Sequence, residues 1–312
     1  MNAPLILVTC RQMQVELPRH RDRIQALGYE VLAPDLAGRQ QFTAAELLEY
    51  SPRLLGIIAG DDELSREFFD GSPKLKTVIR WGIGMDSVDQ DAARLHGVTV
   101  RNTPGVFGHE VADAAFGYIL NLARGQIGVD AAVRRGEWPK HEGITLAETR
   151  LGIVGFGAIG REIAKRGAGF GMEVVAFDPY AGTSGIAVDV PIVGLDEVMT
   201  TSRFIVLACP LTPETSHLIN AERLALMRPD AFLVNVARGP VVREADLIAA
   251  LKADRLAGAA LDVFEVEPLP LDSELRHLPN VILGAHNGSN TREGVARASK
   301  TAVEFLLEEL AR

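Results

Sequence analysis

Short apolar runs alternate with amphipathic stretches along the first third of the chain. The runs rich in β-branched residues predict strands, and the stretches between them place apolar residues at helical spacing. Strands and helices are predicted in turn at "LILVT" (5–9), "RHRDRIQALG" (19–28), "EVLA" (30–33), "TAAELLEY" (43–50), "LLGIIAG" (54–60), "ELSREFF" (63–69), "KTVIRWG" (76–82), "VDQDAARLHG" (88–97) and "VTVRN" (98–102). This alternation is typical of an α/β domain with a parallel sheet.

The alternation pauses at "NTPG" (102–105) and then starts again. A long helix is predicted over "HEVADAAFGYILNLARG" (109–125), and the polar, broken segment 134–150 is interpreted as an arm or linker. Further strands are predicted at about 151–155, 173–177, 203–208, 231–235, 256–261 and 281–284. Residues 291–310, "TREGVARASKTAVEFLLEEL", predict one amphipathic helix.

Composition and charge narrow the class of protein. The chain has 312 residues, more than one hydrophobic core usually organises, so two domains are expected. The formal net charge of −9 disfavours a nucleic-acid partner, which would require a basic surface. Cys10 and Cys209 have neither metal-site nor disulfide spacing, so no metal is expected and a reducing compartment is favoured. Because no signal peptide or membrane span is visible, we expect a soluble cytoplasmic protein.

A glycine-rich turn stands between the apolar run at 151–155 and the next helical pattern. In this turn Gly155 permits a tight bend, Gly157 allows the backbone to approach a pyrophosphate, and Gly160 allows close packing of helix and strand. A turn of this kind is also found in ordinary strand–helix connections. The flanking strand and helix, together with an acid at a suitable distance, favour a dinucleotide site over that alternative.

The acid is Asp178, which ends the predicted strand 173–177 and is placed to accept hydrogen bonds from both hydroxyls of an adenosine ribose. Its charge would repel a 2′-phosphate, so NAD is favoured over NADP. Ala158 and Ile159 open the helix whose N-terminal amides would bind the phosphates. For Arg161, directly after the turn, phosphate contact and simple solvation are both possible, and solvation is favoured.

Ionisable residues follow three further predicted strands. Arg238 follows the strand 231–235, Glu267 lies in the loop after the strand 256–261, and His286 follows the strand 281–284. Each of these residues alone is more often structural than catalytic. The carboxyl ends of parallel strands gather along one edge of a doubly wound sheet, however, so the three side chains are expected to converge.

Together these residues suit hydride transfer with a 2-hydroxy acid. A guanidinium such as that of Arg238 binds a carboxylate in a planar, bidentate way. An imidazole, with an unperturbed pKa of ~6.5, is suited to take or give the hydroxyl proton, which is the role predicted for His286. A carboxylate such as Glu267 would fix the imidazole tautomer and stabilise its charged form. Glycines at 284 and 288 are expected to allow close approach of backbone and cofactor.

At this point the chain resembles the D-isomer-specific 2-hydroxyacid dehydrogenase family, in particular its phosphoglycerate dehydrogenase-like branch. The resemblance rests on five motifs in the family's order and spacing and extends over essentially the whole chain. They are "GIGMDSVD" (82–89), "NTPGVFGHEVAD" (102–113), "GIVGFGAIG" (152–160), "NVARGP" (235–240) and "LDVFEVEP" (261–268).

The resemblance implies an α/β fold of two doubly wound parallel-sheet domains, with a Rossmann NAD-binding domain inserted in a flavodoxin-like substrate domain. The substrate domain is expected at 1–102 and 287–312, and the NAD-binding domain at 103–286. The implied function is NAD-dependent hydride transfer between NAD(H) and C2 of a D-2-hydroxy acid or 2-oxo acid. In the matching set Arg238 is the carboxylate clamp, Glu267 the partner acid and His286 the acid/base, whereas Glu265 is expected to be solvated.

The resemblance also implies further contacts. Beyond the glycine turn and Asp178, cofactor contacts are expected at Pro210, Thr215, Ala237, Asp262, His286 and Gly288. Substrate contacts are expected at Ala59, Gly60, Asp61, Gly82, Ile83, Gly84 and Arg238. A homodimer is expected through the arm around 110–145, which contains "RRGEWPKH".

Two stretches depart from the family. The family commonly has Thr-Pro before the histidine and an apolar residue after it, whereas this chain has Gly284-Ala285 and Asn287, which indicates a more polar site. Asp61 and Asp62 stand in the substrate loop where phosphate-binding relatives carry basic residues, so 3-phosphoglycerate is disfavoured. Arg11, in "TCRQMQ" (9–14), and Arg80 would supply positive charge nearby, although 9–14 is equally well interpreted as a plain strand-to-helix loop.

Three other functions are considered. Formate dehydrogenases share the fold but carry glutamine at the position of Glu267. Phosphite dehydrogenases share the Arg–Glu–His set. NAD-sensing corepressors of this fold would bind NAD without turnover and would need a surface for their partner.

Overall fold

The computed structural model describes residues 3–181 and 190–312. The chain forms two compact units, the first made of residues 1–107 with 290–312 and the second of residues 108–289. The borders between these units, at 107/108 and 289/290, lie within a few residues of the domain borders at 102/103 and 286/287 that the sequence suggested.

The first unit is built on a five-stranded parallel sheet with the order β2-β1-β3-β4-β5. Its strands are β1 (Leu5–Val8), β2 (Glu30–Leu32), β3 (Leu54–Ala59), β4 (Thr77–Arg80) and β5 (Thr99–Asn102). This is the flavodoxin-like order that the resemblance implied. All residues of β1 and β4 are buried, as expected for strands covered on both faces.

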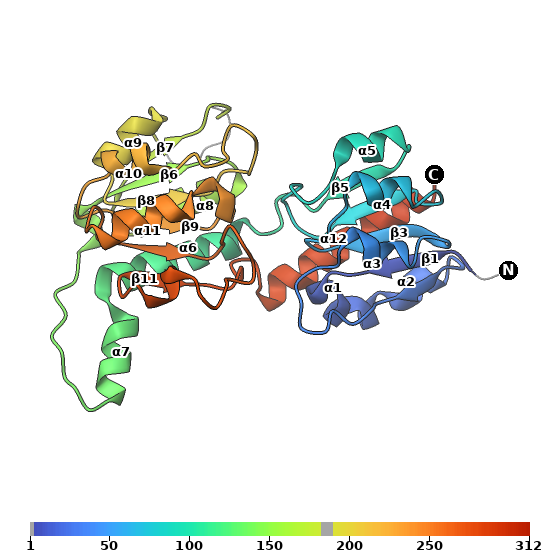
Figure 1. Ribbon diagram of the computed structural model, residues 1–312, viewed down its shortest axis with the longest axis horizontal. Coiled ribbons are helices and arrows are strands. Elements are labelled where there is room, and N and C mark those ends of the chain that lie inside the picture. The colour runs from blue at the N-terminus through green and yellow to red at the C-terminus, as the bar shows by residue number, and fades with distance from the viewer. Residues whose placement is uncertain (1–2, 182–189) are drawn as a thin grey trace. The chain divides into compact units, whose positions relative to one another are not determined.

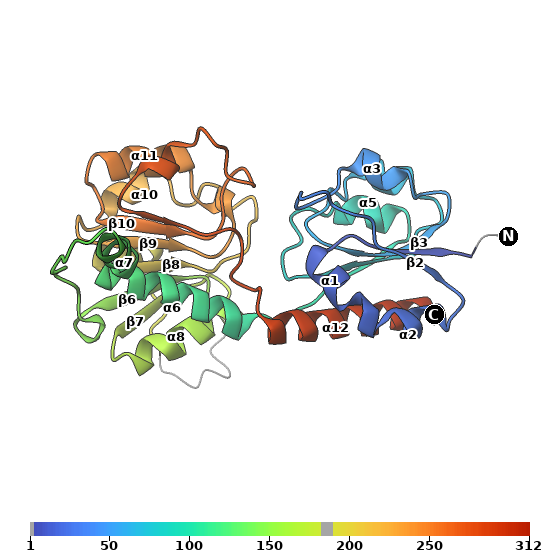
Figure 2. The same cartoon turned by 90° about the horizontal axis from the view of Figure 1, so that it is seen from below.

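Helices cover both faces of this sheet, with α3 and α5 on one side and α1, α2 and α12 on the other (Figure 2). The helices are α1 (Arg11–Glu16), α2 (Arg21–Gln25), α3 (Ala44–Leu48), α4 (Arg66–Asp70), α5 (Gln90–Leu95) and α12 (Arg292–Leu310), and a 3-10 turn spans Leu17–Arg19. The single helix predicted over 19–28 was therefore too long, and a helix at 11–16 was missed. Pro18 accounts for the break, because its ring removes a backbone donor.

Helix α12 is the amphipathic helix predicted at the end of the chain. Thr291 caps it by accepting a hydrogen bond from Gly294 N (3.0 Å). Its buried face packs on β3, β4 and α1 of the first unit. The indole of Trp81, just after β4, donates a hydrogen bond to Ser299 Oγ of α12 (3.0 Å), so the last helix is part of the first unit's core.

The second unit contains a six-stranded parallel sheet with the order β11-β10-β9-β8-β6-β7. Its strands are β6 (Arg150–Val154), β7 (Glu173–Phe177), β8 (Phe204–Leu207), β9 (Phe232–Asn235), β10 (Gly258–Leu261) and β11 (Val281–Leu283). A bridge between Ala176 and Ile192 adds a short further pairing beside β7. The order reverses between β6 and β8, and such a switch point is where doubly wound sheets bind dinucleotides.

Helices α6 and α8 cover one face of this sheet, and α10 and α11 cover the other (Figure 2). The helices are α6 (Gly108–Arg124), α7 (Gln126–Arg134), α8 (Ala158–Gly169), α9 (Leu195–Thr201), α10 (Ala221–Leu226) and α11 (Glu244–Lys252), with 3-10 turns at Leu146–Glu148, Gly239–Val241 and Glu274–His277. Helix α7, which the sequence had not indicated, projects from the unit with the segment that follows it (Figure 1). Residues 135–145 contain neither helix nor strand, in agreement with the predicted arm.

Each unit has its own hydrophobic core. In the second unit Val154, Leu207 and Leu233 from adjacent strands pack with helix residues such as Leu247. In the first unit Ile57 and Val78 pack with Phe68. The predicted α/β class with two doubly wound sheets is confirmed. Among the described helices, none is long and apolar enough to cross a bilayer.

Candidate active site

The glycine turn lies between β6 and α8. Gly155 has φ +96°, a conformation that residues with a Cβ rarely adopt, and an added Cβ would press against the backbone at Cys209. At Gly160 a Cβ would overlap the carbonyl oxygen of Gly155, so only glycine lets the first turn of α8 pack on the strand end. No atom lies within 4 Å of a Cβ built at Gly157. The turn is thus crowded at its first and third glycines and open at its second.

Asp178, just past the end of β7, fixes the other side of this turn. Its Oδ2 accepts a hydrogen bond from Phe156 N (2.7 Å), and its Oδ1 accepts one from Tyr180 N (2.8 Å). Arg161 donates from Nε to Phe156 O (3.1 Å) and lies over the ring of that residue. The interpretation of Arg161 as simply solvated was therefore wrong, because the side chain braces the turn.

These features fit a dinucleotide. Ala158 and Ile159 open helix α8, and no side chain caps its N-terminus at Gly157. Amides at such a helix start attract phosphate oxygens, and the open space at Gly157 lets a ligand reach them. The carboxylate of Asp178 lies at the carboxyl end of the adjacent strand, where a ribose is held in folds of this type.

The loop after β8 carries two more of the expected cofactor residues. Thr215 Oγ1 donates to Pro210 O (2.7 Å) and accepts from Thr212 N (2.7 Å), so Pro210 and Thr215 lie together in one compact turn. Cys209 precedes this turn, and burial raises the pKa of its thiol to about 11. The thiol is therefore protonated and unreactive near neutral pH.

Arg238 stands at the end of β9 in a tightly bonded loop. The buried side chain of Asn235 accepts from Ala237 N (3.0 Å) and donates to Arg238 O (3.0 Å). A Cβ at Gly239 would overlap the backbone of Phe264, so the chain after Arg238 presses directly on the loop that leads to Glu267. The fold thereby brings the ends of β9 and β10 together.

His286 and Glu267 form a pair. Nδ1 of His286 lies 2.7 Å from Glu267 Oε2, and the second oxygen, Oε1, accepts from Phe264 N (2.9 Å). The two side chains are 33% and 28% exposed, so the pair is partly screened from water yet reachable by a ligand. A carboxylate at Nδ1 orients the ring and stabilises its charged form.

Asp262, at the end of β10, is almost fully buried beneath the turn that carries His286. Its Oδ2 accepts from Gly288 N (2.8 Å), and its Oδ1 accepts from Asn287 N (3.2 Å). A Cβ at Gly284 would overlap Asp262 Oδ1 and the hydroxyl of Tyr118. The expectation that Gly284 makes room for the cofactor was therefore wrong, because its space holds two side chains of the protein.

Glu265 is not a simple solvated acid, contrary to the prediction. His217 Nε2 lies 3.0 Å from Glu265 Oε1, which also accepts from Glu244 N (3.3 Å). Burial raises the pKa of the Glu244 carboxyl, and the charges of Glu265 and Glu267 raise it further. A second histidine–carboxylate pair thus stands beside the loop that carries Glu267.

The expected substrate loop after β3 lies in the first unit. Asp62 is fully buried and accepts from Thr9 Oγ1, Phe42 N (2.8 Å) and Gly60 N (2.9 Å). Burial raises the pKa of Asp62. Both carboxylate oxygens of Asp62 accept hydrogen bonds from the protein itself, so Asp62 does not present a carboxylate to a substrate as the sequence had suggested.

Asp61, next to Ala59 and Gly60, forms an ion pair with Arg80. Arg80 also donates to Trp81 O, and its guanidinium lies below Gly82, where a Cβ would come within 2.6 Å of Nη1. Gly82 has φ +140°, which again requires glycine. The pair largely cancels the charge of Asp61, so the acidic character expected of this loop is weaker than its sequence indicates.

The loop at Gly82, Ile83 and Gly84 is held by hydrogen bonds to the last residue of β5 and to the residue after it. Thr103 Oγ1 accepts from Gly82 N (2.9 Å), and Asn102 Nδ2 donates to Ile83 O (2.7 Å). From the sequence, "NTPG" (102–105) was interpreted as a break between elements and as part of a family motif, and its hydrogen bonds to this loop were not foreseen. Arg11 opens helix α1, so residues 9–14 are a strand end and helix start rather than a plain loop.

Sequence reasoning missed three residues that organise these loops: Asn235, Tyr118 and Thr103. Asn235 is a polar residue at the end of the apolar run of β9, a pattern that could have drawn attention to it, and it is buried. Thr103 is also buried, but it follows β5, which is not a buried strand and gave no such signal. Tyr118 follows the helical spacing of α6 and gave no such signal. Within the described part of the chain, no group of three or more potential ligands forms a metal site.

A doubly wound parallel sheet with a glycine turn at its switch point is typical of nicotinamide-dinucleotide oxidoreductases. Comparison with known proteins gives the family. Residues 116–288 match the D-isomer specific 2-hydroxyacid dehydrogenase family in its NAD-binding domain. The chain belongs to this family and is an NAD(P)-dependent oxidoreductase acting on the CH–OH group of 2-hydroxy acids. The predicted family, enzyme class and NAD-binding domain are confirmed.

Individual relatives support the same family. The chain is 41% identical over 266 residues to a glyoxylate reductase of Thermococcus litoralis, covering 80% of this chain and 79% of that protein. It is 36% identical over 301 residues to a D-3-phosphoglycerate dehydrogenase of Methanocaldococcus jannaschii, covering 94% of this chain and 55% of the other. The crystal structure of the TT0316 protein of Thermus thermophilus matches with a TM-score of 0.87 at 35% identity, covering 98% and 97% of the two chains.

Proposed function

We propose that this enzyme transfers a hydride between NAD(H) and C2 of a small D-2-hydroxy acid or 2-oxo acid, with His286 as the acid/base, Glu267 as its partner and Arg238 as the carboxylate clamp. The observation that carries the proposal is the 2.7 Å contact between His286 Nδ1 and Glu267 Oε2 at a strand end. A solvated surface histidine would not require a carboxylate that is itself fixed by a backbone amide.

The proton is assigned to Nε2 of His286, because Glu267 occupies Nδ1. In reduction the charged ring donates this proton to the substrate oxygen, and in oxidation the neutral ring takes the hydroxyl proton. Glu267 stabilises the charged ring in both directions. Imidazole is the suitable group because its unperturbed pKa, ~6.5, lies near neutral pH.

Arg238 is proposed to bind the substrate carboxylate through its planar guanidinium. Its backbone is fixed on both sides, by Asn235 and by the close packing of Gly239 on Phe264. This fixation limits the positions that the guanidinium reaches. A carboxylate held there would keep C2 and its oxygen in one orientation, which is how positioning lowers a barrier.

The cofactor is proposed to be NAD rather than NADP. When bound, the nicotinamide would supply the hydride. Gly155, Gly157, Ala158, Ile159 and Gly160 would hold the pyrophosphate, and Asp178 would accept from the ribose hydroxyls and repel a 2′-phosphate. Pro210, Thr215, Ala237, Asp262, His286 and Gly288 are proposed as the remaining contacts.

The substrate is proposed to be a short 2-oxo acid such as glyoxylate or hydroxypyruvate. The similarity to a glyoxylate reductase supports this choice. Substrate contacts are proposed for the loops at Ala59, Gly60 and Asp61 and at Gly82, Ile83 and Gly84. Arg80 is 5% exposed and its charge is largely cancelled by the pair with Asp61, so this pair offers little net positive charge to a phosphate group.

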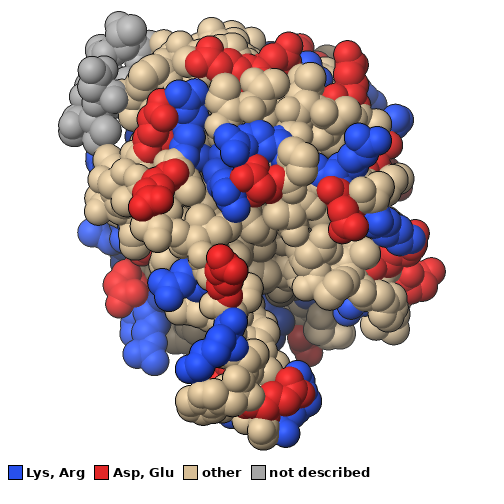
Figure 3. Space-filling view, turned by 90° about the vertical axis from the view of Figure 1, so that its left-hand side faces the viewer, with Lys and Arg blue, Asp and Glu red and all other residues tan. Residues whose placement is uncertain are grey.

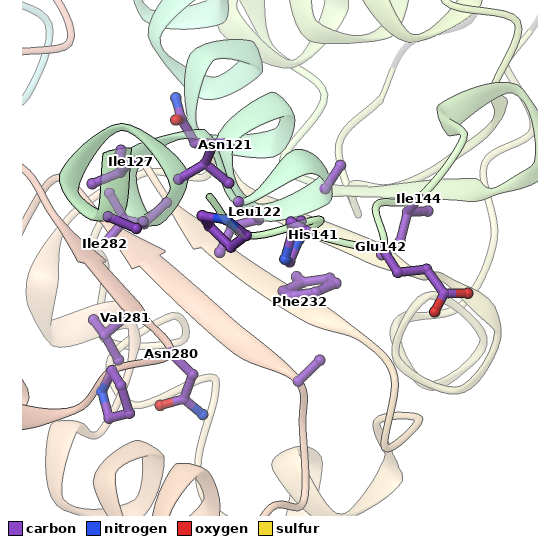
Figure 4. Close-up of a pocket in the computed structure, with 18 of the residues that line it drawn as sticks. Asn121, Leu122, Ile127, His141, Glu142, Ile144, Phe232, Asn280, Val281 and Ile282 are labelled. Atoms are coloured by element: carbon purple, nitrogen blue, oxygen red, sulfur yellow. The ribbon is translucent and has the colours of Figure 1, made fainter. Parts of the chain in front are cut away.

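A cytoplasmic homodimer is proposed, with the arm around 110–145 as its contact. Ile127, Val133 and Trp138 of this arm are exposed by 55%, 41% and 76%. Beneath the arm lies a cavity of about 840 Å³, which Figure 4 shows lined by Leu122, Ile282 and other residues.

Elsewhere on the face drawn in Figure 3 acidic and basic side chains lie next to one another. Exposed apolar groups on a projecting element mark a protein interface.

The experiment is NADH oxidation at neutral pH with glyoxylate, hydroxypyruvate, pyruvate, a branched-chain 2-oxo acid and 3-phosphohydroxypyruvate, with the chirality of each product determined. We expect the D-isomer wherever reduction creates a chiral C2, which excludes glyoxylate because its product is achiral. His286→Ala should lower kcat by at least ~100-fold, because proton transfer is lost, and should change NADH affinity much less, because His286 is only one of the proposed cofactor contacts. His277→Ala, an exposed histidine of the same unit, is the control.

Each other result points elsewhere. Unchanged kcat in His286→Ala would remove that residue from proton transfer. Turnover with phosphite but with no 2-oxo acid would assign a phosphite dehydrogenase. Tight NADH binding without turnover of any substrate would favour an NAD-sensing corepressor-like protein.

A further inference from the structure

Tyr118 of helix α6 donates a hydrogen bond from its hydroxyl to Asp262 Oδ1 (2.8 Å). The two residues are 144 positions apart, and Asp262 is 3% exposed. Burial raises the pKa of the Tyr118 hydroxyl, and the charge of Asp262 raises it further. The hydroxyl therefore stays protonated and remains a donor across the neutral range.

Asp262 in turn holds three successive amides of the turn that carries the proposed acid/base. His286 N donates to the main-chain oxygen of Asp262 (2.6 Å). The amides of Asn287 and Gly288 donate to the two carboxylate oxygens (3.2 and 2.8 Å). The orientation of the Asp262 carboxylate thus decides where this turn lies.

The backbone of His286 itself needs such support. Its φ of +51° is in the left-handed region, which is unfavourable for a residue with a Cβ. The turn adopts this conformation only because surrounding contacts hold it, and in this conformation the imidazole reaches Glu267. Loosening one of these contacts would therefore move the imidazole.

Gly284 provides the space in which hydroxyl and carboxylate meet. A Cβ at this position would overlap both the Tyr118 hydroxyl and Asp262 Oδ1. The glycine and the tyrosine are thus linked, because a side chain at 284 would exclude the hydroxyl.

We propose that Tyr118 is a positioning residue for the reaction: its hydroxyl fixes the Asp262 carboxylate, which holds the turn of His286, and Gly284 is required for this contact. The inference rests on the proposed role of His286. It also predicts an effect that can be measured without substrate, on the hydrogen bond between His286 and Glu267.

The first test is Tyr118→Phe, which removes only the hydroxyl. We expect kcat to fall about tenfold, because a displaced imidazole transfers its proton less well, while the KM for the 2-oxo acid stays within about twofold and the Kd for NADH changes clearly less than kcat. The control variant Tyr29→Phe, which alters a half-buried tyrosine of the first unit, should leave kcat, KM and the Kd for NADH unchanged. Unchanged kcat in Tyr118→Phe would overturn the proposal, and so would an equal loss in kcat and NADH affinity.

The second test is a double-mutant cycle with Gly284→Ala. In the wild-type background this change forces hydroxyl and carboxylate apart, so kcat should fall. In the Tyr118→Phe background the same change should cost less, because the hydroxyl is already gone. Gly117→Ala, next to Tyr118 in α6 but with open space around the added methyl, is the control. Strictly additive losses would contradict the shared space.

A spectroscopic measurement separates this inference from the proposed function. The Nδ1 resonance of His286, assigned with His286→Ala, reports its hydrogen bond to Glu267 in the absence of substrate. It should shift in Tyr118→Phe and stay in place in Tyr29→Phe. If no 2-oxo acid is turned over but this shift is seen, only the proposed function fails. If a 2-oxo acid is turned over but Tyr118→Phe changes neither kcat nor the His286 resonance, only the proposed role of Tyr118 fails.

Discussion

Around the proposed active site, acidic residues that look alike in the sequence face different groups. Glu267 faces an imidazole, Glu265 faces His217, and Asp262 faces backbone amides. Asp62 is enclosed in its own loop. A carboxylate has the same chemistry in each case, so its role depends on which donors the fold places within hydrogen-bond distance.

At residue scale, the guanidinium of Arg238 is open to test. Arg238→Lys should raise the KM for the 2-oxo acid and lower kcat/KM by about 10- to 100-fold, because an ammonium does not replace a bidentate clamp. Steady-state kinetics measure this effect. Arg243→Lys, an exposed arginine just after the same loop, should leave kcat/KM unchanged. Wild-type kinetics in Arg238→Lys would exclude it from carboxylate binding.

Asp178 is the second residue to test. Asp178→Ala should narrow the preference for NADH over NADPH, because it removes both the acceptor for the ribose and the charge that repels a 2′-phosphate. NADH affinity should also fall, since Asp178 holds Phe156 N in the glycine turn. Fluorescence titration with both cofactors measures the ratio. Glu173→Ala, at the other end of the same strand, is the control, and an unchanged ratio in Asp178→Ala would refute the assignment.

At the scale of elements, strand ends and helix starts create the site. The turn from β6 into α8 depends on the absence of side chains at fixed points, whereas the turn after β11 depends on hydrogen bonds to Asp262. The first kind of turn is visible in the sequence as a glycine pattern. The second kind is not, because its partner lies on another strand.

The packing of α8 on β6 gives a prediction at this scale. Gly160→Ala places a methyl group against the Gly155 carbonyl and should destabilise the protein by about 1–3 kcal/mol and weaken NADH binding. Gly169→Ala, in the same helix but with open space, should be neutral or stabilising by up to about 1 kcal/mol. Denaturant unfolding and NADH titration measure both. Equal changes in the free energy of unfolding and in NADH affinity for Gly160→Ala and Gly169→Ala would contradict the packing argument.

For the whole molecule, two units with separate cores are formed from one chain that leaves the first unit and returns to it. The arm that contains α7 exposes Ile127 and Trp138 on the second unit. These are the residues that the proposed second copy would cover.

The proposed homodimer can be tested through this arm. Replacing both Ile127 and Trp138 by glutamate should convert dimers to monomers, because buried charges oppose association. Sedimentation velocity measures the change. Leu271→Glu, which alters an 88% exposed leucine outside the arm, should leave the dimer intact. A monomeric wild-type protein, or a dimeric double variant, would refute the assignment.

The sequence by itself determined the features that depend on local pattern. Strands and helices follow from periodicity, the glycine turn from residues whose missing Cβ is required nearby, and the family from motifs along the chain. Helix boundaries near Pro18 were misplaced: α1 was missed and α2 is shorter than predicted, with a 3-10 turn at Leu17–Arg19 between them. The domain borders and the roles of the individual site residues stay predictions.

Only the tertiary structure decided which side chains meet. Two of these contacts join residues that are distant in sequence, namely Glu265 with His217 and Tyr118 with Asp262. In a third case, the fold turns the side chain of Asp62 inward. Hydrogen bonds act over about 3 Å, so they depend on the final positions of atoms and leave no periodic trace in the chain. For that reason the sequence indicated the reaction, and the fold assigned the neighbours of each group.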